Sequence, residues 1–174
     1  MKRLILMRHS IAAVEASTDF ERKLTERGIV KSKSQAMKLD DYLEKNGIEI
    51  DFSFVSSAVR TKETFEYVTC LLEIKETPHV FTRALYLTGI RELKRVFIDY
   101  NDKIEDFDTI MLFLHNNGVS KIASRLSDMS IYFDTANIAI LTFDDRVGED
   151  INEKKILWNK SLDYEGNWEL DYFI

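Results

Sequence analysis

Two unbroken apolar runs constrain the fold of this chain more than any other feature. Leu4–Met7, within a predicted strand over residues 2–7, and the predicted strand 109–114 both lack an alternation of polar and apolar residues. Such runs are typical of strands that are buried on both faces. Strands of that kind occur in parallel sheets that are covered by helices, so the two runs favour an α/β domain.

Strand-like and helix-like segments alternate along most of the chain. Further strands are predicted at 52–55, around 80–81 and at 137–143, and helices from Thr25 to Asn46-Gly47, from near Ala58 towards Ile74, from Ile90 to Tyr100 and over 118–127. This order predicts one doubly wound, mostly parallel sheet with helices on both faces, forming a single α/β domain over residues 1–174. Trp168, Leu170 and Tyr172 alternate with polar residues, which predicts an edge strand with one wet face.

Composition limits the classes of partner. A chain of 174 residues with 45% apolar content can form a real core, and its net charge of −6 argues against general nucleic-acid binding. No apolar segment is long enough to span a membrane, and the apolar stretch after Met1-Lys2-Arg3 stops at Arg8, too early for a signal peptide. The single Cys70 has no disulfide partner within the chain. We therefore expect a cytoplasmic protein without nucleic-acid or membrane partners.

Two histidines directly follow strand-like runs, His9 after the first strand and His115 after 109–114. Both should emerge at the carboxyl edge of the sheet, where α/β folds bind ligands. Arginines such as Arg8 and Arg60 match the oxygens of a phosphate dianion, and a neutral imidazole can attack phosphorus. Arg60 is also predicted in the first turn of a helix, where a positive charge is unfavourable unless an anion is bound. Phosphoryl transfer through a histidine is the leading hypothesis.

The ordered motifs resemble those of the histidine phosphatase superfamily, in the branch that contains phosphoglycerate mutase. They are Arg8-His9-Ser10, Arg22 before Leu24-Thr25 and Gly28, Ser56-Ser57 followed by Arg60 and Thr64, and His115-Asn116-Asn117-Gly118. The short chain is most similar to the protein phosphohistidine phosphatases of the SixA type. The resemblance extends from Arg8 to about Leu126.

The resemblance implies a role for each matched residue. His9 corresponds to the nucleophile that accepts the phosphoryl group, and Arg8, Arg60 and His115 correspond to groups that surround the phosphate. Arg22 corresponds to a further phosphate-binding arginine, and Asn116 is a predicted substrate contact. Ser10 replaces the usual glycine and could add a hydroxyl donor.

Elementary electrostatics agrees with these roles. Cationic groups, with His115 in its protonated form, would stabilise the charge that moves onto the phosphoryl oxygens. The same cations would keep His9, whose ordinary pKa is about 6.5, in the neutral form that can attack.

The sequence lacks the residue patterns that other phosphatase chemistries require. Cys70 has Glu76 where a cysteine phosphatase needs an arginine, so we predict a core cysteine within a helix. The acidic pairs Asp40-Asp41 and Asp144-Asp145 lack histidine partners at ligand spacing and are predicted to be a solvated helix face and a turn. No metal or cofactor is indicated. The third histidine, His79, is predicted to be structural or exposed.

The substrate class depends on the leaving group. Related mutases and sugar phosphatases usually carry a glutamate that protonates the leaving oxygen, and Glu92 is the candidate here, although a surface residue is an equal interpretation. The segment between Arg60 and His115 leaves no long lid. These features favour hydrolysis of protein phosphohistidine by a metal-independent phosphatase. A small-molecule phosphomonoesterase and a non-catalytic module that binds phosphorylated ligands are the alternatives.

Overall fold

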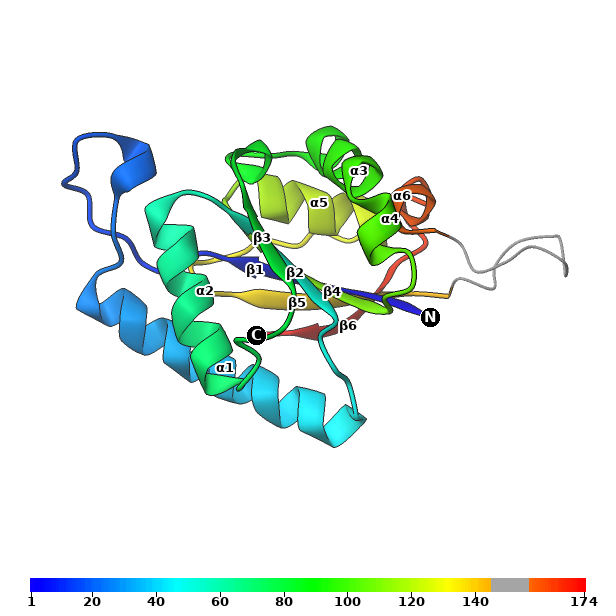
Figure 1. Cartoon of the computed structure of the whole chain (residues 1–174), viewed down its shortest axis with the longest axis horizontal. Coiled ribbons are helices and arrows are strands. Elements are labelled where there is room, and N and C mark those ends of the chain that lie inside the picture. Colours follow the sequence, from blue (N-terminus) through cyan, green and yellow to red (C-terminus); the bar gives the residue numbers. More distant parts are fainter. Residues whose placement is uncertain (145–156) are drawn as a thin grey trace, which may run out of the picture.

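The computed structural model describes residues 1–144 and 157–174 and contains a six-stranded sheet with the order β3-β2-β4-β1-β5-β6 (Figure 1). The strands are β1 (Lys2–Arg8), β2 (Phe52–Ser56), β3 (His79–Thr82), β4 (Thr109–Leu114), β5 (Ile138–Phe143) and β6 (Glu169–Phe173). Every predicted strand is present within two residues of its expected bounds. The α/β prediction with a mostly parallel sheet is therefore confirmed.

One strand runs against all the others. β1, β4, β2 and β3 pair in parallel, whereas β5 is antiparallel to both β1 and β6. The reason lies in the segment 128–137, which follows the last helix before β5 and carries the chain back to the carboxyl end of β1. There the Arg8 amide donates to the Asn137 carbonyl and the Ala136 amide to the His9 carbonyl. The strand that follows can only run in the opposite direction.

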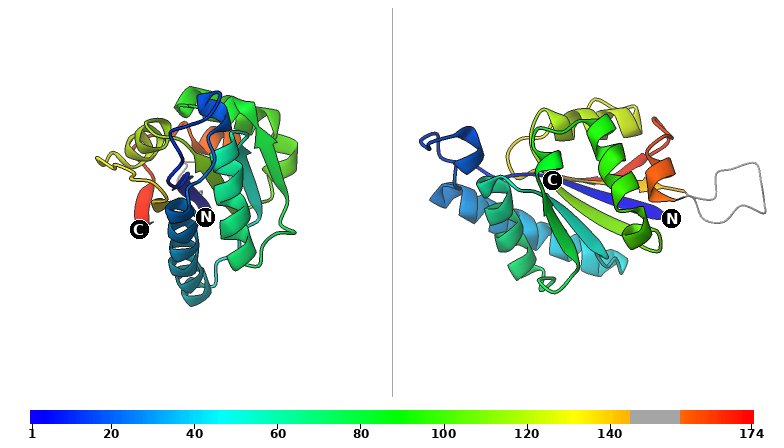
Figure 2. Two further views of the ribbon diagram at one scale, coloured as in Figure 1. Left: turned by 90° about the vertical axis from the view of Figure 1, so that its left-hand side faces the viewer. Right: turned by 45° about the horizontal axis from the view of Figure 1, so that its top comes forward.

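Helices cover both faces of the sheet (Figure 2). They are α1 (Glu26–Asn46), α2 (Val59–Leu71), α3 (Ile90–Asp99), α4 (Asn101–Ile104), α5 (Gly118–Ser127) and α6 (Trp158–Ser161), with short 3-10 turns η1 (Asp19–Glu21) and η2 (Arg83–Leu85). Leu4 and Leu6 of β1 face α3, α5 and α6, while Ile5 and Met7 face α1 and α2. Each central strand is thus buried on both faces, which explains its unbroken apolar run.

The first helix has the predicted ends. The Thr25 side chain accepts a hydrogen bond from the Gly28 amide at 3.0 Å, and Gly47 ends α1 in the left-handed region with φ of 60°. Such caps satisfy the backbone groups that helix ends leave unpaired.

The second helix corrects two predictions. α2 ends at Leu71 rather than at Ile74, and Cys70 is exposed rather than in the core. Cys70 lies one helical turn beyond Glu66, on the stripe of α2 that faces solvent, whereas Phe65 and Val68 lie on the buried stripe.

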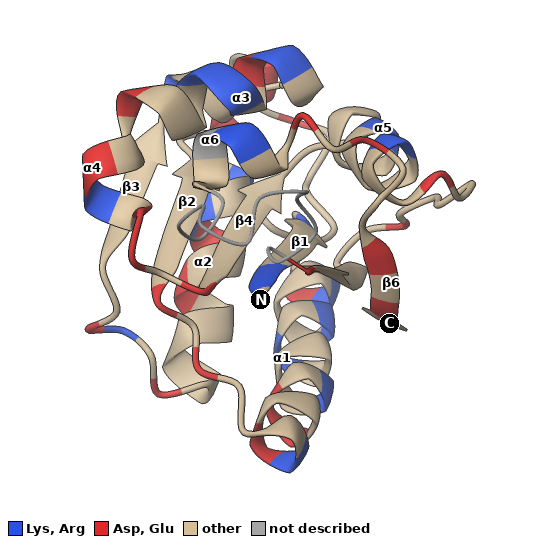
Figure 3. Cartoon of the chain, turned by 90° about the vertical axis from the view of Figure 1, so that its right-hand side faces the viewer, with Lys and Arg blue, Asp and Glu red and all other residues tan. Residues whose placement is uncertain are grey.

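The edge-strand prediction for the last segment is confirmed. Along β6 exposed residues alternate with partly buried ones, and the preceding Trp168 is buried. The outer surface mixes charges, since α1 and α3 both carry acidic and basic residues (Figure 3). Among the described residues, no helix combines the length and the apolar content that a membrane span requires.

A close backbone approach holds the segment after β1 against α1. A Cβ atom added to Gly28 would lie 2.1 Å from the Ile11 carbonyl oxygen, far inside van der Waals contact. Only glycine allows this approach. Gly28 therefore fixes the distance between α1 and the backbone that carries His9.

We predict that Gly28→Ala lowers the free energy of unfolding by about 2 kcal/mol or more, because overpacking against backbone cannot be relieved by a side-chain rotation. Urea unfolding measures this difference. Gly89→Ala is the matched control, since its Cβ would meet only the flexible Glu92 side chain at 3.2 Å. Equal losses in the two variants would contradict the explanation.

Candidate active site

The carboxyl ends of three neighbouring strands bring the predicted residues together. His9 follows β1, His115 follows β4, and Ser56 ends β2, with Arg60 in the first turn of α2 just beyond it. Because β2, β4 and β1 are adjacent and parallel, their carboxyl ends meet at one edge of the sheet. Motifs more than 100 residues apart along the chain thus form one cluster.

Arg60 lies at the centre of this cluster and is only 3% exposed. Its Nε donates to Nε2 of His9 at 3.1 Å, and its Nη2 donates to Nδ1 of His115 at 3.2 Å. The two imidazole ring centres are 5.1 Å apart. One guanidinium group therefore links both histidines.

These bonds fix the tautomer of His9. An arginine can only donate, so Nε2 of His9 must carry the lone pair, and Nδ1 donates to the Ser10 carbonyl at 2.7 Å. Burial, together with the smaller effects of the Arg60, Arg8 and Arg22 charges, outweighs the raising effect of the Ser10 bond and lowers the pKa of His9 to about 4. His9 is thus neutral at pH 7, with its nucleophilic nitrogen directed at the arginine cluster.

His115 is held in the opposite tautomer. Its Nδ1 accepts from Arg60, so Nε2 carries the proton and donates to Ser56 Oγ at 2.7 Å, with Thr61 Oγ1 at 3.3 Å. Burial, followed by the neighbouring His9 and Arg60, lowers the pKa of His115 to about 3. The expectation of a protonated His115 is therefore wrong for this arrangement.

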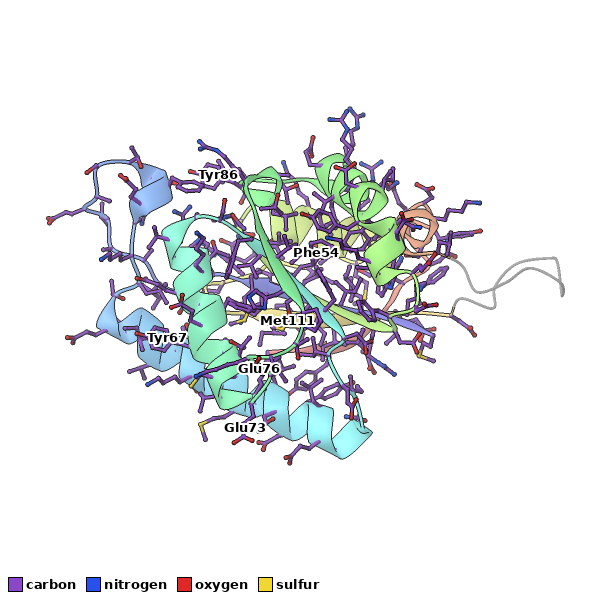
Figure 4. The ribbon with its side chains drawn as sticks, viewed as in Figure 1. Phe54, Tyr67, Glu73, Glu76, Tyr86 and Met111 are labelled. Atoms are coloured by element: carbon purple, nitrogen blue, oxygen red, sulfur yellow. The ribbon has the colours of Figure 1, made fainter. Side chains whose placement is uncertain are left out.

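Asp19 and Tyr86 complete the cluster, and sequence reasoning missed both. Asp19 Oδ2 accepts from Arg60 Nη2 at 2.9 Å and from the Tyr86 hydroxyl, and Asp19 Oδ1 accepts from Arg22 Nη1 at 3.0 Å. Tyr86 comes directly after η2, and its side chain lies beside η1 (Figure 4). The bonds from Tyr86 and Arg22, and then from Arg60, hold the pKa of Asp19 well below its usual range. The only sequence signal was the spacing of Asp19 three residues before Arg22.

The two outer arginines approach the cluster from different sides. Arg8 Nη1 donates to the Phe133 carbonyl at 2.9 Å, and Arg22 Nε donates to the Ala13 carbonyl. Both guanidinium charges lower the pKa of His9. Four predicted cationic or imidazole groups thus converge around His9.

Ser10 and Asn116 hold the framework in this structure. Ser10 is fully buried, its hydroxyl donates to the Gly28 carbonyl at 2.7 Å, and its amide donates to Thr64 Oγ1 at 3.1 Å. Asn116 accepts from Ser120 Oγ at 2.6 Å and donates to the Phe133 carbonyl at 3.0 Å. Both side chains have their hydrogen bonds within the protein, so we assign them to positioning the backbone around the two histidines.

Glu92 lies in the first turn of α3 and is a helix cap. Its Oε2 accepts from the Gly89 amide at 3.1 Å. The backbone amides at this helix end lower the pKa of Glu92, so the carboxylate is ionised at pH 7 and holds no proton to donate. His79 is exposed, with its ring against Phe65 and Phe81, as predicted.

A metal site requires several histidine, cysteine or carboxylate side chains in one place. Within residues 1–144 and 157–174, no group of three or more His, Cys, Asp or Glu side chains is placed to hold a metal ion. Asp41 is exposed on α1, as predicted for a solvated helix face. The predicted turn at Asp144-Asp145 falls partly outside the described residues.

Comparison with known proteins adds structural likeness only. No family model matches the chain, and no curated protein matches it in sequence. Among solved structures, the protein histidine phosphatase SixA complexed with tungstate aligns with a TM-score of 0.73 at 20% identity, over 99% of this chain and 96% of that one. A mycobacterial glucosyl-3-phosphoglycerate phosphatase aligns at 0.64 and 10% identity, over 98% and 97%.

A third likeness belongs to the same fold. A phosphoserine phosphatase variant from Entamoeba histolytica aligns with a TM-score of 0.58 at 14% identity, over 99% of this chain and 96% of that one. The chain therefore has the fold that SixA and the phosphoglycerate mutase-like phosphatases share.

The two buried histidines predict how stability depends on pH. Their folded-state pKa values lie below the ordinary 6.5, so the unfolded chain binds more protons once the pH falls below that value. The contribution of the two neutral histidines to the free energy of unfolding should therefore be fully present above about pH 6.5. It should fall by roughly 2 kcal/mol for each histidine by about pH 5. Urea unfolding of the wild type, His9→Gln and His115→Gln at both pH values measures how much of this pH-dependent loss belongs to each histidine.

The exposed His79 supplies the control for this measurement. His79→Gln should lose stability between the two pH values as the wild type does. If His115→Gln shows the full wild-type loss, the neutral buried state assigned to His115 is wrong.

Proposed function

We propose that this chain is a phosphatase of the histidine phosphatase superfamily that works through phosphorylated His9 and acts on protein phosphohistidine. The observation that carries the proposal is the pair of bonds from Arg60 to Nε2 of His9 and Nδ1 of His115. Through these bonds two imidazoles and a permanent cation lie around one point, which supports the assignment of His9 as the nucleophile. The fold that the chain shares with SixA supports the same conclusion.

In the first step, Nε2 of His9 attacks phosphorus in line with the leaving group. The substrate reacts with its phosphorylated ring protonated on the other nitrogen. The new Nε2–P bond forms as the bond from phosphorus to the substrate nitrogen breaks, and the substrate ring leaves as neutral imidazole. His9 needs no general base, because its lone pair is already on the attacking nitrogen and its Nδ1 proton is bound to the Ser10 carbonyl. That bond also stabilises the positive charge that develops on the ring.

Arginines stabilise the charge on the transferred group. Arg60, Arg8 and Arg22 remain charged at any working pH, and guanidinium forks match the equatorial oxygens of a phosphoryl group. Arg60 gives up its bond to Nε2 of His9 as phosphorus takes that position. His115 contributes polar contacts through Nδ1. A bound dianion would favour a proton on this nitrogen and so raise the pKa of His115.

In the second step, water attacks phospho-His9, and the Nε2–P bond breaks to release inorganic phosphate. The same cationic groups serve both steps, because the charge on the phosphoryl oxygens is alike in both. No part of this cycle requires a metal or an organic cofactor in our proposal.

The leaving group argues for phosphohistidine. An alcohol leaves as an alkoxide unless an acid protonates it, whereas an imidazole leaves far more readily. The candidate acid, Glu92, is an ionised helix cap. The rim also suits a large substrate, since the side chains of Asp19 and Arg22 are 51% and 29% exposed. A phosphorylated protein domain is the proposed partner, and the lone, exposed Cys70 is consistent with the cytoplasm.

A small-molecule phosphomonoesterase is the second candidate. The structural likeness to a glucosyl-3-phosphoglycerate phosphatase and to a phosphoserine phosphatase favours it. A module that binds phosphorylated ligands without turnover is the third, and detection of a phosphoenzyme separates it from the other two.

We predict that His9→Ala removes turnover of a phosphohistidine peptide while the protein stays folded, because the proposed covalent step forms its new bond at Nε2 of His9. Rapid quench with labelled substrate should show acid-labile, base-stable phosphate on the wild type and none on the variant. His79→Ala, at an exposed histidine, should keep wild-type turnover. Normal turnover by His9→Ala would refute the proposed mechanism.

We further predict that Glu92→Gln changes the rate on a phosphohistidine peptide by less than about threefold, because a positioned acid is worth 10²–10⁴-fold only where the leaving group needs it. The wild type should hydrolyse this peptide much faster than a phosphoserine peptide. A large loss in Glu92→Gln, together with good turnover of alkyl phosphates, would favour the small-molecule phosphatase instead.

A further inference from the structure

One carboxylate belongs to the arginine cluster without being part of the proposed chemistry. Asp19 lies on η1 with its side chain half exposed, and its two carboxylate oxygens accept from Arg60, Arg22 and Tyr86. Its main-chain oxygen accepts from Nη1 of Arg60 as well. A negative charge is therefore fixed where the buried cations meet the solvent.

Asp19 also occupies the donors that a second anionic group on the substrate would need. Nε and Nη2 of Arg60 are shared among His9, His115 and Asp19. On Arg22, Nε is bound to the Ala13 carbonyl and Nη1 to Asp19, which leaves Nη2 for a phosphoryl oxygen. Arg22 can thus donate to one phosphoryl group through Nη2, but its Nε and Nη1 groups are already bound within the protein.

We infer that Asp19 is a specificity-determining residue that selects against phosphoryl compounds with a second negative charge beside the phosphoryl group. This inference rests on the proposed function only in placing a phosphoryl group between His9 and the arginines. An adjacent carboxylate on the ligand would meet the Asp19 carboxylate instead of a free guanidinium edge. A neutral or cationic neighbour would be accepted.

The excluded and accepted classes differ in simple chemistry. Phosphorylated hydroxy acids and free phosphorylated amino acids carry a carboxylate close to phosphorus and belong to the excluded class. A phosphorylated imidazole within a polypeptide has amides in place of that carboxylate and belongs to the accepted class. Asp19 thereby separates protein-bound phosphohistidine from small acidic metabolites.

The direct test measures binding of two non-hydrolysable ligands, ethylphosphonate and phosphonoacetate, which differ by one carboxylate. Calorimetry at low salt, at a pH where both are fully ionised, should give the wild type at least about fivefold weaker binding of phosphonoacetate, as expected for like charges at a protein surface. Asp19→Asn should bring the two dissociation constants within about twofold. The amide keeps the size of the side chain and removes its charge.

Glu21→Gln is the matched control. Glu21 lies on the same turn, and its carboxylate accepts from Thr18 at 3.1 Å instead of from an arginine. This variant loses one charge of the same loop and should keep the wild-type ratio of dissociation constants. A ratio that falls equally in both variants would mean that only the total charge matters, which overturns the assignment to Asp19.

Two other results would also overturn the inference. If Asp19→Asn weakens the binding of both ligands by the same factor, Asp19 positions Arg60 and has no part in selecting the ligand. If the wild type binds neither ligand, or binds both equally, the carboxylate does not discriminate. Because binding needs no turnover, the result is independent of the phosphoenzyme experiment, whose failure would speak against the proposed function alone.

Discussion

The site depends on how one buried guanidinium group is shared. Arg60 is buried, and its donors are divided among two imidazoles and a carboxylate. This sharing fixes which nitrogen of His9 is free to react, because an arginine never accepts a hydrogen bond. A lysine in the same place could supply the charge but not the fixed directions. The tautomer of His9, on which the proposed reaction depends, is thus determined by the geometry of a residue on a different element.

The rest of the fold serves to hold that geometry. α2 begins directly after β2, so the first helical turn places Arg60 over the end of β4, where His115 emerges. Ser10, buried beneath His9, ties the end of β1 to both α1 and α2 through the Gly28 carbonyl and the Thr64 hydroxyl. A glycine at this position would lack the hydroxyl and so could not form the bond to the Gly28 carbonyl. Burial of the whole arrangement is what makes the two imidazoles neutral.

The sequence predicted the fold well because its signals are local and periodic. Unbroken apolar runs marked β1 and β4, and caps at Thr25 and Gly47 marked the long helix. It placed the strand-end histidines correctly for the same reason. The direction of β5 was beyond such signals, since only the path of segment 128–137 decides it. Cys70 was misjudged because a helix was assigned without deciding which stripe faces solvent.

The misses within the site have a different cause. Asp19 and Tyr86 come from irregular segments that approach one another only in the folded chain, and neither stands in a periodic pattern. The protonation of His115 depends on burial and on Arg60, which no linear spacing reveals. The sequence therefore revealed the candidate residues at strand ends, but it did not reveal those that are brought together by contacts between loops.

The carbonyl oxygen of Phe133 has a consequence for how such sites evolve. It accepts from both Arg8 and Asn116, and so joins the ends of β1 and β4 through the segment that turns the chain back into β5. Every amino acid offers the same carbonyl. Part of what this segment contributes to the site therefore lies in its length and path, whereas Asp134 contributes through its side chain, which forms an ion pair with Arg8 at 3.9 Å. Substitution of Phe133 leaves its carbonyl in the chain, whereas a deletion within 128–137 changes the path that brings this carbonyl to Arg8 and Asn116.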